Sequence, residues 1–188
     1  MASALLSRGP LDRASLPQGD RLAIRLAPRA ARFLLRGSPA AAALVEPAFG
    51  AALPLQPRRA SQAGARAALW LGPDEWLLIA EGETPESLGP TWETALAGEP
   101  HSLVDVSGRQ VGLELKGPLV ALALNAGCPL DLGLAAFPVG EATRTMLSKA
   151  EIVLWRKAPQ HFHVEVWRSF ADYAVTFLAE AARRAPPP

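Results

Sequence analysis

The chain of 188 residues has little of what most metal, redox and nucleic-acid sites require. It has one cysteine, Cys128, so an intramolecular disulfide is impossible and a cysteine-based zinc site would lack ligands. Its formal net charge is only +1, which gives no strong field to attract nucleic acid or an acidic membrane surface. No run approaches the roughly 20 apolar residues that span a bilayer, and the N-terminal apolar run is too short for a signal peptide. These absences predict a cytoplasmic protein without nucleic-acid or membrane partners.

Sequence motifs for nucleotide binding and nucleophilic catalysis are missing as well. No Gly-x-Gly-x-x-Gly or Walker-type loop occurs, so the chain lacks a flavin or nucleotide fingerprint. Ser107 follows Asp105 closely, but no Gly-x-Ser-x-Gly elbow surrounds it, and such side chains commonly bind backbone amides at a strand end. Cys128 follows a helix-terminating glycine, where the helix dipole disfavours a thiolate, and this favours a buried apolar role.

His161 and His163 are the remaining candidates for a metal site, because they lie two residues apart on a predicted strand and share one face. No third histidine, cysteine or carboxylate lies at a supporting spacing, which favours surface or edge packing over metal binding. The sequence therefore predicts no catalytic, cofactor-binding or metal-binding residue in this chain.

The sequence does contain an internal repeat: the predicted helices and strands follow a similar order in residues of about 21–98 and 101–183. The first half has predicted strands at 21–26 and 32–36, a helix between Ser38 and Gly50, a hairpin at 67–80 and a helix at 85–97. The second half has predicted strands at 102–106 and 110–115, a helix at 117–125, strands at 143–147, 151–156 and 162–167, and a helix from its cap Ser169 to residue 183.

This repetition predicts an α+β fold, in which each half contributes a strand, a helix, a hairpin and a helix. We expect residues 21–183 to form a single domain of two similar halves rather than a doubly wound sheet. Residues 1–20 are predicted to form an irregular N-terminal arm. Residues 184–188 are predicted to be a frayed tail, because Pro186–Pro188 cannot continue a helix.

Four tryptophans on predicted strands lie near turns or charged neighbours, which suits either a sheet core or a protein interface. Tryptophan and arginine together are over-represented at binding hot spots. The candidate partner interface combines aromatic or charged character with turn positions, and it comprises Trp70, Asp74, Glu75, Trp76, Arg144, Trp167 and Arg168.

Several long strings in the chain resemble the gamma subunits of heterotetrameric sarcosine oxidase. They are LWLGPDEWLL at 69–78, CPLDL at 128–132, FPVG at 137–140 with TRT at 143–145, KAEIVLW at 149–155 and FHVEVWRSF at 162–170. These strings stand in the same order as in the family. The resemblance covers about residues 20–183.

The resemblance implies a fold similar to the folate-binding module of glycine-cleavage aminomethyltransferases. The segments VDVS at 104–107, Gly117-Pro118 and Cys128 to Leu132 are similar to that superfamily's pattern. In the aminomethyltransferases, a glycine-rich turn leads into a strand with an aspartate that serves folate chemistry. The matching stretch here, Ala150–Trp155, has neither the glycines nor the aspartate, so the resemblance implies a fold that has lost the transferase site.

The resemblance further implies a complex of alpha, beta, gamma and delta subunits. That complex oxidises sarcosine to glycine, hydrogen peroxide and formaldehyde, or 5,10-methylenetetrahydrofolate when tetrahydrofolate is present. FAD, FMN, NAD, tetrahydrofolate and zinc are expected in the other subunits and none in this chain. The expected role of this chain is a non-catalytic structural subunit that contacts alpha and beta directly. Two alternatives stay open: a gamma-like subunit of a related N-methyl amino acid oxidase or dehydrogenase, and a stand-alone folate-binding one-carbon protein.

Overall fold

The computed structural model describes Leu11 and residues 16–185 of the chain. Most of the predicted N-terminal arm, 1–10 and 12–15, and the end of the predicted tail, 186–188, therefore lie outside the described residues. The strands are β1 (Ala23–Leu26), β2 (Ala30–Gly37), β3 (Ala60–Ala63), β4 (Arg66–Gly72), β5 (Glu75–Glu81), β6 (His101–Asp105), β7 (Gln110–Lys116), β8 (Ala142–Leu147), β9 (Ala150–Ala158) and β10 (His161–Trp167). The helices are α1 (Pro39–Phe49), α2 (Pro85–Ala95), α3 (Val120–Asn125) and α4 (Ala171–Arg184), with a 3₁₀ turn, η1 (Arg168–Phe170), before α4.

The strands form two antiparallel five-stranded sheets, which confirms the predicted α+β class. The first sheet has the order β3-β4-β5-β2-β6, and the second has the order β1-β7-β10-β9-β8. When the second order is read from β8, the strands β3, β4, β5 and β2 of the first half correspond to β8, β9, β10 and β7 of the second half. The fifth strand of each sheet, β6 or β1, comes from the other half. β1 pairs with β7 of the second sheet, while β6 pairs with β2 of the first. Each half of the chain thus gives its first strand to the other half's sheet.

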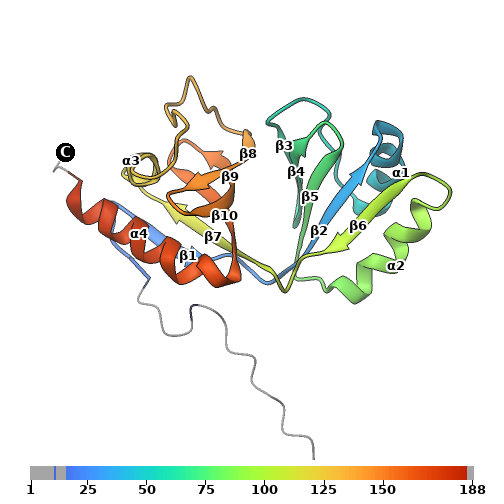
Figure 1. The fold of residues 1–188 in the computed structure, drawn as a ribbon, viewed down its shortest axis with the longest axis horizontal. Helices are drawn as coiled ribbons and strands as arrows, with labels where there is room; N and C mark the ends of the chain where they lie inside the picture. Colours follow the sequence, from blue (N-terminus) through green and yellow to red (C-terminus); the bar gives the residue numbers. More distant parts are fainter. Residues whose placement is uncertain (1–10, 12–15, 186–188) are drawn as a thin grey trace, which may run out of the picture.

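Two short connections carry this exchange. The chain passes from β1 to β2 and from β6 to β7 where the two sheets meet, and Figure 1 shows the two connections close together at the bottom of the molecule. Neither half can complete a five-stranded sheet alone, because one strand of each sheet comes from the other half.

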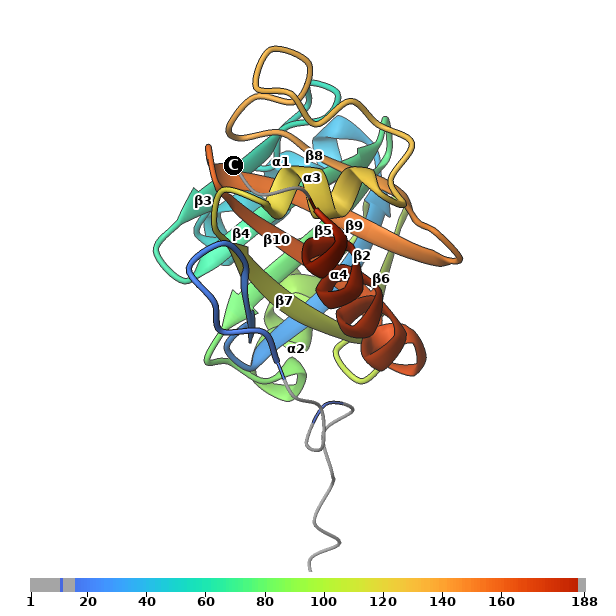
Figure 2. The ribbon, with the colours of Figure 1, turned by 90° about the vertical axis from the view of Figure 1, so that its left-hand side faces the viewer.

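The molecule has four layers, with a helix pair on the outer face of each sheet and the two sheets facing each other. Helices α1 and α2 pack on the first sheet, and α3 and α4 pack on the second (Figures 1 and 2). A third apolar cluster joins the sheets, and it comprises Ala67, Leu69, Leu77, Ile79, Val106, Ala142, Val153 and Trp155. Central strands such as β5 are therefore buried on both faces, which explains its continuous apolar run from Trp76 to Ala80.

Local capping decides the ends of α1 as the sequence predicts. The side chain of Ser38 accepts hydrogen bonds from the backbone N–H groups of Ala40 and Ala41. At the other end Gly50 adopts a left-handed conformation, with φ of 76°, and its N–H donates to the carbonyl of Glu46. Pro47 is accommodated inside the last turn of the helix.

One local prediction is wrong, and one strand was not predicted at all. Ser169 does not cap the last helix, because the chain first makes the 3₁₀ turn η1 and α4 begins at Ala171 with no side-chain cap. Strand β3 was not predicted, because its sequence ASQA is short and largely polar, and pairing with β4 rather than its own pattern creates it. Among the helices of the described residues, none is long and apolar enough to cross a membrane.

Candidate functional site

The predicted interface residues fall into two regions and include one core residue. Trp76 is wholly buried, at 0% exposure, and its indole N–H donates to the carbonyl of Pro54 at 2.7 Å. Its ring packs in the apolar cluster between the first sheet and helices α1 and α2. Trp76 was therefore wrongly included in the predicted interface, because its indole cannot reach a partner's surface.

The first region is the turn between β4 and β5 with the neighbouring strand β8. Trp70 is half-buried, and Asp74 is exposed and lies 3.5 Å from Arg36. The guanidinium of Arg144 on β8 lies 2.7 Å from the carboxylate of Glu75 on β5, so this ion pair crosses from one sheet to the other. The hydrogen bond from Arg144 to Glu75, together with the carboxylate charge, raises the pKa of Arg144.

The second region lies at the end of β10. Trp167 is 40% exposed, and the guanidinium of Arg109 lies over its ring at 5.4 Å from the ring centre. The backbone N–H of Arg168 donates to the carbonyl of Arg109 at 2.7 Å, which ties η1 to the start of β7. Tryptophan and arginine are both enriched at the hot spots of protein interfaces.

Between the two sheets lies a buried charged cluster that the sequence reasoning missed. On β10 the alternate residues Phe162, Val164 and Val166 pack in the core beneath α3 and α4. The intervening residues His163 and Glu165 are buried on the opposite face, toward the first sheet. Strand alternation suggested a surface or edge position for this polar face, whereas the other sheet covers it.

The members of this cluster form one chain of hydrogen bonds. The Nδ1 of His163 lies 2.8 Å from a carboxylate oxygen of Glu114 on β7, and its Nε2 lies 2.8 Å from Oε1 of Glu165. The Nε of Arg32, on β2 of the first sheet, donates to Oε2 of Glu165 at 2.7 Å. At the outer end, His161 and Lys157 contact Glu114. The cluster thus joins the two sheets by charge as well as by apolar contact.

Mutual neutralisation keeps these buried groups charged. Burial disfavours the cation of His163, but hydrogen bonds with Glu114 and Glu165 outweigh burial and raise the pKa of His163 to about 9. Burial would raise the pKa of Glu114, but His163, His161 and Lys157 lower it to about 2. Burial also opposes the charge of Glu165, yet His163 and Arg32 hold its pKa below the ordinary value. Burial lowers the pKa of His161, despite its hydrogen bond with Glu114.

Gly112 on β7 provides the space for the central ion pair. A Cβ atom at this position would lie 2.8 Å from Nη2 of Arg32 and 2.9 Å from Oε1 of Glu165. It would also lie 2.8 Å from the Cβ of Ala27, on the connection between β1 and β2. A side chain here would therefore force the guanidinium, the carboxylate or the β1–β2 connection to shift.

A cavity of about 570 Å³ lies beside the inner end of the cluster. Its wall includes Arg32 of β2, Ser107 of the β6–β7 connection, Gln110 of β7 and Arg168 of η1. Ser107 serves the backbone, as the sequence predicts: its hydroxyl oxygen accepts from the N–H of Arg32 at 2.8 Å, and it contacts Asp105 at 2.6 Å. Ser107 thus fastens β6 to β2.

The chemistry of the cluster is limited by its own contacts. Both ring nitrogens of His163 and both carboxylate oxygens of Glu165 are already hydrogen-bonded to neighbouring side chains. Within Leu11 and residues 16–185, no group of three or more histidine, cysteine or acidic side chains is arranged to hold a metal ion. The geometry is that of a hydrogen-bonded charge network buried between the two sheets.

Comparisons with known proteins agree with the resemblance seen in the strings. Residues 36–184 match the model of the family described as "Sarcosine oxidase, gamma subunit family". The sarcosine oxidase subunit gamma of an Arthrobacter species is 40% identical over 148 residues, which covers 77% of this chain and 70% of the relative.

Two solved structures resemble the fold. A chain of the heterotetrameric sarcosine oxidase from Corynebacterium sp. U-96 has a TM-score of 0.86 and 31% identity, over 97% of this chain and 99% of that chain. Glycine cleavage system aminomethyltransferase T from Bartonella henselae has a TM-score of 0.64 and 15% identity, over 87% of this chain and 49% of that chain. The second likeness confirms the expected aminomethyltransferase-like fold. By its family match and its curated relatives, this chain belongs to the sarcosine oxidase gamma subunit family.

Proposed function

We propose that this chain is a non-catalytic structural subunit of a heterotetrameric sarcosine oxidase. The observation that carries the proposal is the match with a chain of the Corynebacterium complex, which extends over nearly the full length of both chains. The two folds therefore correspond along 97% of this chain and 99% of that chain.

The buried charges support a structural role. Acid–base chemistry needs a group with a free lone pair or proton within reach of a substrate. Here the imidazole of His163 and the carboxylate of Glu165 use all their polar atoms on Glu114, Arg32 and each other. Glu151, on the strand that matches the aminomethyltransferase site, is exposed and lies 3.9 Å from Arg144.

The partners and cofactors follow from the proposed complex. We place the alpha and beta subunits in direct contact with this chain and the delta subunit in the same complex. FAD, FMN, NAD, tetrahydrofolate and zinc belong to those subunits in this proposal, and the complex works in the cytoplasm. The surface residues assigned to partners are Trp70, Asp74, Glu75, Arg144, Trp167 and Arg168.

We also infer that residues 21–183 fold as one domain of two similar halves, 21–98 and 101–183. The exchanged strands support this inference, since each sheet takes four strands from one half and one from the other. The charged cluster adds to it, because Arg32 and Glu165 come from different halves.

Co-expression tests the proposed function. The chain is produced alone and together with the other subunits of the oxidase, and the products are compared by size-exclusion chromatography, absorbance spectra and sarcosine oxidation. A colourless, inactive single chain that co-elutes with a yellow, active assembly is the expected result. A chain that stays apart from those subunits and binds tetrahydrofolate would instead identify a stand-alone folate-binding protein. An assembly that oxidises only other N-methyl amino acids would identify a related oxidase or dehydrogenase.

A further inference from the structure

The two helix layers differ, although they occupy equivalent places on the two sheets. In the first half, α1 has 11 residues and lies beside α2, also of 11 residues. In the second half, α3 has only 6 residues beside the 14 residues of α4. The second layer therefore lacks the helical turns that would cover the outer part of α4.

Aromatic side chains show the consequence of this difference. In the first layer the rings of Phe49 and Trp92 meet edge to face at 5.3 Å, and both side chains are fully buried. In the second layer Tyr173 and Phe177 of α4 are only half-buried, with ring centres 6.2 Å apart. The ring centre of Phe170 lies 6.4 Å from that of Tyr173, and Phe170 is 38% exposed.

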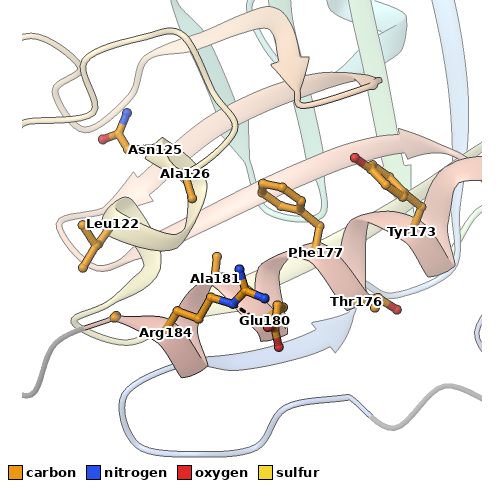
Figure 3. Close-up of a pocket in the computed structure, with 10 residues that line it drawn as sticks. Leu122, Asn125, Ala126, Tyr173, Thr176, Phe177, Glu180, Ala181 and Arg184 are labelled. Atoms are coloured by element: carbon orange, nitrogen blue, oxygen red, sulfur yellow. Dashed lines mark hydrogen bonds and ion pairs between the residues drawn. The ribbon is translucent and has the colours of Figure 1, made fainter.

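A groove of about 620 Å³ lies between α3 and α4, where the layer is incomplete. Figure 3 shows the rings of Tyr173 and Phe177 rising from α4 toward the side where α3 lies. Leu122 of α3, which is 49% exposed, lines the groove with Ala126 and Ala181. The volume is sufficient for one or two large apolar side chains.

The charges at one end of the groove are unbalanced. The carboxylate of Glu180 lies 2.8 Å from Arg183 and 2.6 Å from Arg184, so one anion is shared by two cations. Both arginine side chains remain more than 70% exposed. This end is thus suited to a partner that places an acidic residue beside its apolar side chains.

We propose that the groove between α3 and α4 receives a hydrophobic segment of a partner subunit of the oxidase, with a bulky apolar side chain over Phe177 and Leu122 and an acidic residue near Arg184. The inserted side chain completes the second helix layer as Trp92 completes the first. The proposal rests on the proposed function, because it takes the partner from the same complex.

The test uses the complete assembly with single substitutions in this chain. Leu122→Arg and Thr176→Arg place a charge in the groove, and both residues are exposed in the single chain. Leu44→Arg is the matched control, since Leu44 is a 46% exposed leucine on α1 of the other layer. We expect the two groove variants to weaken assembly about tenfold or more and Leu44→Arg to leave it unchanged. Arg184→Glu should weaken assembly most at low ionic strength. Unfolding midpoints of the separate chains verify that each variant folds.

The outcomes separate this inference from the proposed function. If the unmodified chain fails to join the other subunits, the proposed function fails and the inference fails with it. If the unmodified chain and both groove variants assemble equally well, the function stands and the groove is not a docking site. Self-association of the single chain that Leu122→Arg abolishes, with normal assembly of the complex, would instead assign the groove to a second copy.

Discussion

The Nε2 of His163 lies 2.8 Å from a carboxylate oxygen of Glu165, and both side chains are buried between two sheets that come from different halves of the chain. Arg32 reaches the second oxygen of Glu165 from the opposite sheet. Glu165 thus joins the charges of the two sheets, and removal of its carboxylate charge should destabilise the fold.

Glu165→Gln should lower the free energy of unfolding by about 3–5 kcal/mol, because it leaves the buried cations of Arg32 and His163 with too little negative charge. Urea denaturation of the single chain measures this. Asp74→Asn is the matched control: it removes a carboxylate from an exposed ion pair with Arg36 and should change stability by less than about 0.5 kcal/mol. Equal effects of the two substitutions would show that the buried network contributes no more than a surface pair.

The free energy of unfolding should decrease as the pH rises above about 6.5. His163 has a pKa raised from 6.5 to about 9, so its contribution is fully present below pH 6.5 and is lost as the pH rises through about 9. At about 1.4 kcal/mol per pKa unit, the loss is on the order of 3 kcal/mol. Glu114, lowered from 4.5 to about 2, contributes above pH 4.5 and loses its contribution as the pH falls toward 2. Stability from these two groups is therefore greatest between about pH 4.5 and 6.5.

Urea denaturation across pH 5–10 measures the alkaline decline, and NMR titration of the imidazole identifies its source. His101→Asn is the control, since the pKa of this surface histidine is also raised, chiefly by its hydrogen bonds with Glu99 and Glu93. The decline should persist in that variant. Titration of His163 below pH 6.5 would contradict the prediction.

Truncation of Trp76 should destabilise the chain far more than truncation of Trp167. Trp76→Ala removes a fully buried ring and should lower the free energy of unfolding by about 3–5 kcal/mol. Trp167→Ala removes a partly exposed ring that stacks with Arg109, and should cost less than about 1 kcal/mol in the single chain. Under the proposed function, Trp167→Ala should nevertheless weaken co-elution with the other subunits. An unstable Trp167→Ala chain would place that ring among the structural residues.

Arg156 should stabilise the loop between α3 and β8. Its buried guanidinium donates to the carbonyls of Leu132 and Phe137 and lies 4.5 Å from the ring centre of Phe162. Arg156→Met should lower the free energy of unfolding by about 2–4 kcal/mol, because the buried carbonyls lose their hydrogen-bond donor. Hydrogen exchange should rise in residues 132–137. Arg144→Met, which removes a surface guanidinium, should leave exchange in that loop unchanged.

Local sequence rules accounted for much of the secondary structure. Ser38, Pro39 and Gly50 marked the ends of α1, because capping depends on a few adjacent residues. The turn at 72–75 between two apolar runs predicted the β4–β5 hairpin for the same reason. The repeated order of elements predicted the fold class, and the sequence segments that resemble the family predicted the family. Both could be recognised without the structure.

The tertiary structure decided which sheet each strand joins and which polar residues are buried. The alternation of apolar and polar residues in β1 and β6 is compatible with a place in either sheet. The local sequence pattern therefore could not reveal that these two strands are exchanged. Likewise, the polar face of β10 could be read only as a surface face or an edge. The first sheet covers this face, and Arg32, 133 residues earlier in the chain, brings the opposite charge to Glu165. Charge pairing over such a sequence separation depends on how the two sheets pack, and that packing is a property of the whole fold.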